Sequence, residues 1–139
     1  MNKLLILGLF LPLKHIDITS GYGYRIHPVT GKYAFHSGID LRARHDTVFA
    51  IADGAASIGY NSLIGLYVRI TDGQFTAVYG HLSRFLIGQS IVTAGTPIAI
   101  TGATGRVTGE HLHLTLKYDC NYLDPLKFLF ELINPNYHE

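Results

Sequence analysis

Two histidines separated by one residue form the most informative pattern in this chain. The segment His111-Leu112-His113-Leu114-Thr115-Leu116-Lys117 alternates strictly, so a strand would place the three leucines on one face and both histidines on the other. The two imidazoles would then stand about 7 Å apart along that face. The pattern suits a metal site, although two histidines on a solvated strand face would give the same alternation.

A second pattern adds a carboxylate. His36-Ser37-Gly38-Ile39-Asp40 places a histidine and an aspartate four residues apart, and Gly38 between them can let the backbone turn so that both side chains converge. Two imidazoles and one carboxylate suit Zn²⁺ and leave the fourth tetrahedral position open for water, as in catalytic zinc sites. The short motif occurs readily by chance, so it carries weight only together with His111 and His113.

A further histidine is expected at the end of a strand. Tyr79-Gly80-His81-Leu82 closes a run of β-branched and aromatic residues, and a side chain there can project from the rim of a sheet into a cleft. A structural role for this lone histidine is the alternative.

Short strands must position these residues. From Ile18 onward, glycine turns separate β-branched and aromatic runs, and helical periodicity is almost absent, which predicts an all-β domain with a mainly antiparallel sheet. A hairpin is expected between residues 66–71 and 75–79, because Asp72-Gly73 tolerates the positive φ angles of a tight turn.

More strands and one helix complete this prediction. A pair of strands is expected within residues 48–60, around Asp53-Gly54, and two short runs are expected within 91–101. One short C-terminal helix is expected over residues 125–132, where proline suits the first turn. It would close one side of the sheet with a shared face of three residues, which are Phe128, Leu129 and Leu132.

Composition limits the classes of function. The 139 residues are 47% hydrophobic and only 15% charged, which is typical of one globular domain. The net charge of +1 provides no basic patch, so we expect no nucleic-acid partner. The single Cys120 excludes an intrachain disulfide, and no segment reaches the roughly 20 apolar residues that span a bilayer.

The N-terminal segment has two open interpretations. Lys3 followed by the apolar run 4–11 resembles the start of a secretory signal, but no small-residue cleavage site follows. Alternatively, residues 4–13 form an apolar strand or a packed arm. We therefore divide the chain into an N-terminal apolar segment, residues 1–17, and a domain over residues 18–139.

In order and context, these motifs resemble the M23 metallopeptidases, the family of lysostaphin, LytM and related peptidoglycan endopeptidases. The resemblance runs from about Ile18 to Leu129 and includes Thr19-Ser20-Gly21-Tyr22-Gly23-Tyr24-Arg25, His27-Pro28, residues 36–40, residues 79–82 and residues 104–113. No His-Glu-X-X-His motif is present, so a thermolysin-type site is not supported.

The resemblance implies a zinc-dependent peptidase with a lysostaphin-like fold. One Zn²⁺ would be held by His36, Asp40 and His113, while His81 and His111 would face the substrate and share acid–base work. The substrate would be a peptide of bacterial peptidoglycan, cut in a groove of the sheet. The resemblance also implies that the protein, encoded by a bacterium or a mobile element, acts in the cell envelope or outside the cell.

Two other functions compete with this one. A non-catalytic M23-like module would bind peptidoglycan or activate an amidase, but such modules lose metal ligands, whereas this chain keeps the full set. A D-alanyl-D-alanine peptidase of a related zinc class would also use His, Asp and His. Its first two ligands are usually farther apart than His36 and Asp40.

The remaining polar residues are expected to be structural. Glu110 should point away from the face that carries His111. Arg25 and Tyr33 could contact substrate, but bracing a loop and packing on a rim are the favoured roles. No metal is expected at the other four histidines, which are His15, His27, His45 and His138, and His27 should fix a loop before Pro28.

Overall fold

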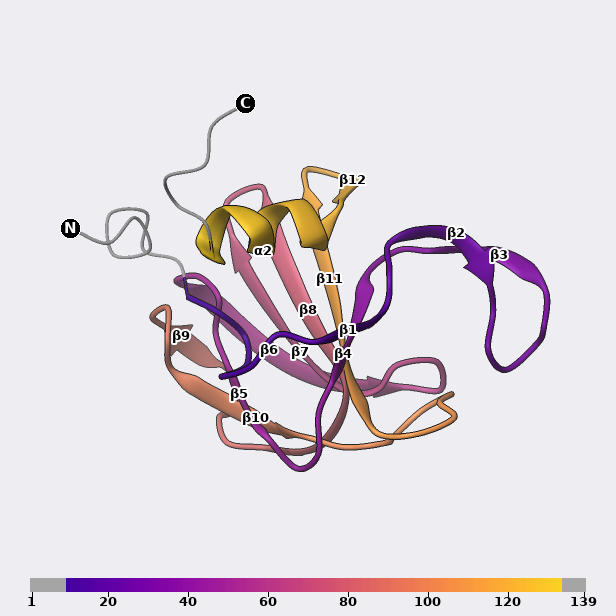
Figure 1. The fold of residues 1–139 in the computed structure, drawn as a ribbon. Helices are drawn as coiled ribbons and strands as arrows, with labels where there is room; N and C mark the ends of the chain where they lie inside the picture. The colour runs from indigo at the N-terminus through magenta and orange to yellow at the C-terminus, as the bar shows by residue number, and fades with distance from the viewer. Residues whose placement is uncertain (1–9, 134–139) are drawn as a thin grey trace.

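The computed structural model describes residues 10–133, and it is built around one large antiparallel sheet (Figure 1). The main path of this ten-stranded sheet is β1-β4-β11-β8-β7-β6-β9, with β5, β10 and β12 attached beside it. The strands are β1 (Ile18–Ser20), β2 (Gly23–Ile26), β3 (Tyr33–His36), β4 (Ile39–Arg42), β5 (Thr47–Phe49), β6 (Gly54–Asn61), β7 (Gly65–Asp72), β8 (Phe75–Phe85), β9 (Ser90–Val92), β10 (Pro97–Thr101), β11 (His111–Tyr118) and β12 (Asn121–Leu123). The predicted all-β class is confirmed.

The alternation read from the sequence of β11 is confirmed. Leu112, Leu114 and Leu116 are fully buried and belong to the hydrophobic core. This core continues under β4 and β8, where Leu41 and Tyr79 are also fully buried. The apolar core fixes the register of these strands, because a slip by one residue would move every leucine of β11 out of the core and onto the face of the histidines.

Of the two predicted strand pairs, one forms and one does not. β7 and β8 make the expected hairpin, with Gly73 at a φ of 58°. The prediction that the strands on either side of Asp53-Gly54 form a pair is wrong, because β5 pairs with β10 while β6 pairs with β7 and β9. Asp53 does not close a hairpin; its carboxylate accepts a hydrogen bond from the Ala94 N–H at 2.7 Å.

The two short runs predicted within residues 91–101 are confirmed as β9 and β10, which occupy separate places in the sheet. The helix is also confirmed, as α2 (Pro125–Ile133). The Asp124 carboxylate accepts the Leu126 N–H at its start. Leu129 is buried and the ring of Phe128 stacks on Phe75, so α2 covers the sheet as expected (Figure 1).

The side chain of Leu132, the third residue of the expected helix face, lies outside the described part of the structure. Within residues 10–133, no helix is long and apolar enough to cross a membrane.

Residues 10–17 run along the sheet. The Phe10 N–H donates to the Ile51 carbonyl, the Phe49 N–H donates to the Pro12 carbonyl, and Leu13 is buried in the core. Residues 1–9, which hold most of the apolar run, lie outside the described residues. The boundary at residue 18 stays a prediction.

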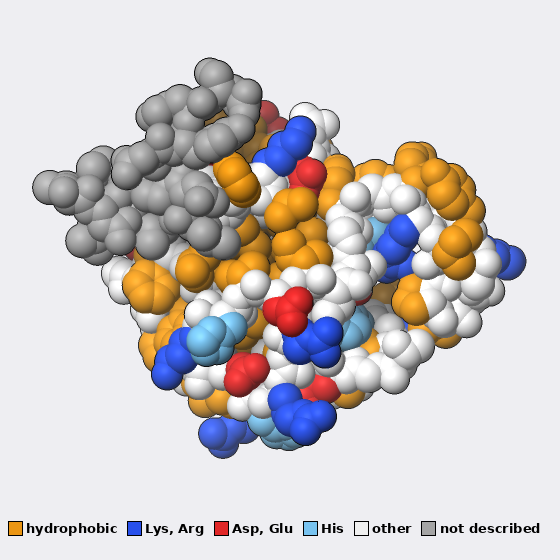
Figure 2. All heavy atoms as spheres, in the orientation of Figure 1, with side chains coloured by type: hydrophobic (Ala, Val, Ile, Leu, Met, Phe, Trp, Pro, Cys, Tyr) orange, Lys and Arg blue, Asp and Glu red, His pale blue; other side chains and the backbone are white. Residues whose placement is uncertain are grey.

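β2 and β3 form a separate two-stranded hairpin that projects from the body (Figure 1). Their register pairs Gly23 with His36 and Arg25 with Ala34, so these four residues share one face. The other face is apolar and exposed, and Figure 2 shows hydrophobic side chains gathered over the hairpin. Its residues are Tyr24, Ile26, Tyr33 and Phe35, which are 44–70% exposed.

Candidate active site

Asp40 and His113 lie directly opposite each other on neighbouring strands. β4 and β11 are antiparallel, and their register pairs Asp40 with His113. Cross-strand pairs of this kind bring side chains on one face into contact. Both residues are buried, with 8% and 9% of their surfaces exposed, so the sheet itself holds them in place.

His36 reaches the same point from the hairpin. It is the last residue of β3, and Ser37-Gly38 leads directly into β4. Gly38 was expected to serve the turn, but its φ is not positive. Its lack of a side chain matters instead, because a Cβ there would collide with the Leu114 carbonyl oxygen. The glycine therefore lets the link between β3 and β4 press against β11.

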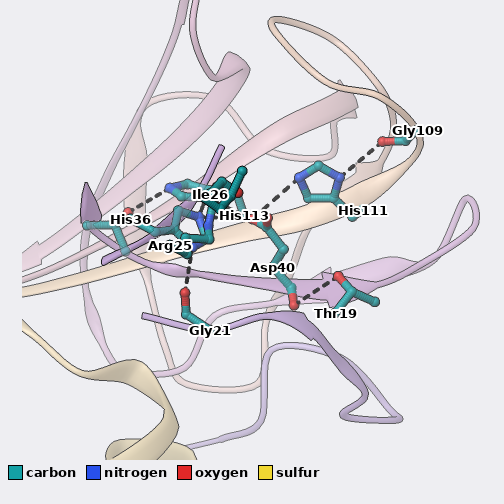
Figure 3. A network of polar contacts seen from close by, with 10 residues as sticks. Thr19, Gly21, Arg25, Ile26, His36, Asp40, Gly109, His111 and His113 are labelled. Carbon is teal, nitrogen blue, oxygen red and sulfur yellow. Dashed lines mark hydrogen bonds and ion pairs between the residues drawn. The ribbon is translucent and has the colours of Figure 1, made fainter. Parts of the chain in front are cut away.

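Three ligand-type atoms converge in this way, as Figure 3 shows for their side chains. His36 Nε2 lies 3.3 Å from His113 Nδ1 and 3.4 Å from Asp40 Oδ1, and His113 Nδ1 lies 3.1 Å from Asp40 Oδ1. Tetrahedral zinc with bonds of about 2.0–2.1 Å separates its ligand atoms by about 3.3 Å. The triangle therefore fits one zinc ion. Among the described residues, His36, Asp40 and His113 are the group whose ligand atoms lie close enough together to hold a metal.

The ring nitrogens of His36 and His113 that point away from this triangle are also hydrogen-bonded. His36 Nδ1 lies 2.8 Å from the Gly21 carbonyl, which can only accept, so Nδ1 carries the proton and Nε2 keeps its lone pair. His113 Nε2 lies 3.0 Å from Thr115 Oγ1, which leaves its Nδ1 toward the cluster. Partners of this kind fix the tautomer and orientation of zinc-binding histidines.

Burial and hydrogen bonding act in opposite directions on the carboxylate. Burial alone would raise the pKa of Asp40, but interactions with the three surrounding histidines outweigh burial and hold this pKa well below its usual range. Asp40 is thus a carboxylate at neutral pH, which is the form that binds a metal.

His81 lies inside β8 rather than at its end, so its expected position is corrected. β8 continues to Phe85 because it leaves β11 at Gly80 and pairs with β10 from Leu82 onward. His81 takes a φ of 61° at this change of partner. A non-glycine residue in that conformation is uncommon and clusters at functional sites.

His81 and His111 stand beside the cluster, with ring centroids 4.8 Å apart. Each uses Nδ1 to donate to a backbone carbonyl, His81 to Thr104 at 2.7 Å and His111 to Gly109 at 3.0 Å. Each therefore turns Nε2 inward, and that of His111 lies 3.4 Å from Asp40 Oδ1.

The two rings have pKa values shifted in opposite directions. Burial lowers the pKa of His81 to about 4, although its bond to Thr104 acts the other way. Burial would also lower the pKa of His111, but its hydrogen bond to Asp40 outweighs burial and raises this pKa. Neighbouring titratable groups with such different environments suit the sharing of proton donation and acceptance.

A groove of about 600 Å³ opens over all five residues, and its lining includes residues of the hairpin and residues 106–108. The lining residues include Arg25, Arg106 and Thr108. The structure therefore brings together every predicted site residue in one accessible hollow.

Glu110 and His27 have the structural roles predicted for them. Glu110 turns away and accepts the Thr101 hydroxyl at 3.1 Å and the His45 N–H. His27 Nδ1 accepts the backbone N–H groups of Val29 and Thr30 and so holds the hairpin loop. His15 and His45 lie away from the cluster, and His138 lies outside the described residues.

The sequence interpretation missed the residues that orient the histidines. Thr115 continues the alternation of His111 and His113, so the same period-two pattern could have placed it on their face. The carbonyls of Gly21 and Thr104 had no such signal, because backbone groups of distant segments carry no side-chain pattern.

Comparisons with known proteins agree with this geometry. The profile of peptidase family M23 matches residues 34–125. The chain is 36% identical over 121 residues to the DD-carboxypeptidase/endopeptidase Mpg of Neisseria meningitidis serogroup B, an alignment that covers 83% of this chain and 27% of the relative. The chain thus spans about a quarter of the length of this curated relative.

Solved structures share the fold. A zinc-containing peptidase from Vibrio cholerae superposes with a TM-score of 0.75 and 32% identity, covering 82% of this chain and 37% of that one. The catalytic domain of lysostaphin from Staphylococcus simulans superposes with a TM-score of 0.74 and 26% identity, covering 83% of this chain and 92% of that one. With the family profile matched over most of its length, this chain belongs to the M23 peptidase family.

Proposed function

We propose that this protein is a zinc-dependent endopeptidase that hydrolyses peptide bonds of bacterial peptidoglycan. The observation that carries the proposal is the triangle of His36 Nε2, Asp40 Oδ1 and His113 Nδ1, with edges of 3.1–3.4 Å. Family membership supports a peptidase, and a relative from Vibrio cholerae that is named a peptidoglycan DD-endopeptidase, ShyA, supports the substrate class.

His36, Asp40 and His113 would hold one zinc ion. When bound there, zinc would polarise the scissile carbonyl and lower the pKa of a water molecule to near 7. With three protein ligands, zinc would keep a fourth position for water or substrate, as a catalytic site requires.

His81 and His111 would act on the substrate. Because both rings donate through Nδ1 to the backbone, their Nε2 atoms would be the ones that exchange protons with reacting groups in the groove. The pair would share proton transfer and stabilisation of negative charge on the scissile carbonyl oxygen. Hydrogen bonds to fixed carbonyls keep both rings in place for this work.

The substrate class implies where the protein acts. Peptidoglycan lies outside the bacterial cytoplasmic membrane, so we propose the cell envelope or the cell exterior as the site of action. We keep residues 18–139 as the proposed peptidase domain, which contains all five residues of the site.

Release of new amino groups from purified peptidoglycan sacculi tests the proposal, with zinc content measured in the same samples. The zinc-loaded chain should release amino groups, and a chelator should stop the release. Bound zinc without cleavage of several wall types would favour the alternative, a non-catalytic M23-like module that binds peptidoglycan or activates an amidase.

A further inference from the structure

Arg25 occupies a place in the groove that the proposed reaction has not used. It lies two residues from Gly23, the cross-strand partner of His36, and on the same face of the hairpin. Diagonal neighbours on such a face have Cα atoms about 7–8 Å apart, within reach of a long side chain. Arg25 also lines the groove that contains His36 and His111.

The guanidinium of Arg25 is poorly satisfied by the protein. It carries five N–H donors. Its single hydrogen bond among the described residues runs from Nη1 to the Ile26 carbonyl at 3.4 Å, which is long. Nε is buried and has no partner. Nε and Nη2 therefore have no acceptor in the described protein.

Arg42 shows what a braced arginine looks like in the same fold. Its Nε lies 2.8 Å from Asp17 Oδ2, outside the groove. Arg25 has no carboxylate within ion-pair distance among residues 10–133. The prediction that Arg25 braces a loop is therefore supported by one weak contact alone.

The charge of the groove favours an anion. Arg25 and Arg106 both line it, and Asp40 is the one carboxylate among its described lining residues. The three histidines that surround Asp40 already engage that carboxylate. A poorly satisfied guanidinium beside a peptide-cleaving site suits a carboxylate carried by the substrate.

We propose that Arg25 binds a carboxylate of the peptide substrate and so positions the scissile bond over the candidate zinc site. This inference rests on the proposed function. Because Nε is buried, the two terminal nitrogens, Nη1 and Nη2, would form the charge-assisted hydrogen bonds with the carboxylate oxygens. The carboxylate comes either from the C-terminus that follows the scissile bond or from an acidic residue that precedes it.

Two pairs of synthetic peptides separate these sources. In the first pair, the C-terminus after the scissile bond is a carboxylate in one peptide and a carboxamide in the other. In the second pair, the acidic residue before the scissile bond carries a carboxylate in one peptide and a carboxamide in the other. For one pair, the carboxamide should lower kcat/KM of the zinc-loaded chain by about 10- to 100-fold, mainly through KM. Arg25→Gln should remove this difference, and thermal unfolding should show that the variant is folded.

Two further variants sharpen the assignment. Arg106→Gln, which changes the other arginine of the groove, should keep the preference for the carboxylate. Arg25→Lys should keep part of it, because lysine supplies charge without the two-pronged geometry of a guanidinium. An Arg25→Gln variant that keeps the full preference in both pairs would overturn the proposal.

A binding measurement separates this inference from the proposed function. The ¹⁵N–¹H resonance of Arg25 Nε, identified by its loss in Arg25→Gln, should shift when the zinc-loaded chain is titrated with the preferred carboxylate peptide but not with its carboxamide. If no peptide is cleaved and the resonance shifts, the proposed catalysis fails while the carboxylate site stands. If peptides are cleaved and the resonance is unmoved by every carboxylate peptide, the role of Arg25 is refuted.

Discussion

The two regions that build the candidate site differ in how firmly the fold holds them. β4, β11 and β8 lie inside the large sheet, and their register alone brings Asp40 to His113. The β2–β3 hairpin pairs only with itself and contributes His36 from its base. A two-stranded hairpin is marginally stable alone, so the position of His36 depends on its anchors at the sheet.

The difference separates two tasks. The central sheet fixes two candidate ligands and both neighbouring histidines, so it should determine zinc binding and turnover. The hairpin adds the third ligand at its base and extends beyond it as a wall of the groove, where Arg25 lies. We therefore expect substitutions in the sheet to affect metal and chemistry, and those far out on the hairpin to leave both intact.

The largest effect is expected from the sheet ligand. His113→Ala removes one corner of the triangle and leaves Asp40 without its closest partner, so zinc binding should be lost. Zinc content after dialysis measures this, with His15→Ala as the matched control at an exposed histidine outside the cluster. One zinc per chain retained by His113→Ala would contradict the ligand assignment.

The next effect separates chemistry from metal. His81→Ala should keep zinc and lower turnover of peptide substrate by about 100- to 10,000-fold, because proton transfer by a positioned side chain contributes this much. Zinc content and kcat are measured on the same preparation. Loss of zinc together with activity would move His81 into the metal-binding group.

The junction between the two regions is tested by Gly38→Ala. The new Cβ would collide with the Leu114 carbonyl, so the link from β3 to β4 must shift, at a cost of about 1–3 kcal/mol in unfolding free energy. Denaturant unfolding with chelator present excludes any metal contribution. Gly88→Ala is the control, because its Cβ would meet no atom within 4 Å, and equal stability of the two variants would refute the close-contact role.

The smallest effect is expected on the outer face of the hairpin. Tyr24 is 69% exposed and stacks on Tyr33, so Tyr24→Ala should change the unfolding free energy by less than about 1 kcal/mol. Zinc content should be unchanged. A loss of zinc in this variant would show that the hairpin and the sheet are not separable in the way described.

Sequence patterns predicted what depends on local periodicity. The alternation of β11 gave the buried leucines and the shared face of His111 and His113, and the turn residues gave the β7–β8 hairpin. The strand pairing around Asp53 was wrong because β5 pairs with β10, while β6 pairs with β7 and β9. Short-range turn signals cannot register a competing partner so distant in the chain.

The sequence predicted which residues form the candidate site better than it predicted how the backbone and side chains are arranged there. The resemblance to a known family indicated all five residues, and the structure brings them together. The conformation of His81 could not be read from the sequence, because it arises where β8 exchanges β11 for β10. The unpaired Nε of Arg25 could not be read from the sequence either, since it depends on which acceptors the folded chain fails to provide.

The proposed function depends on one zinc ion bound among His36, Asp40 and His113. Anomalous scattering at the zinc absorption edge, measured on crystals of the zinc-loaded chain, locates this ion. We expect one strong peak about 2.0–2.2 Å from His36 Nε2, Asp40 Oδ1 and His113 Nδ1. A peak elsewhere, or none among these three side chains in a chain that binds one zinc, would refute the zinc site.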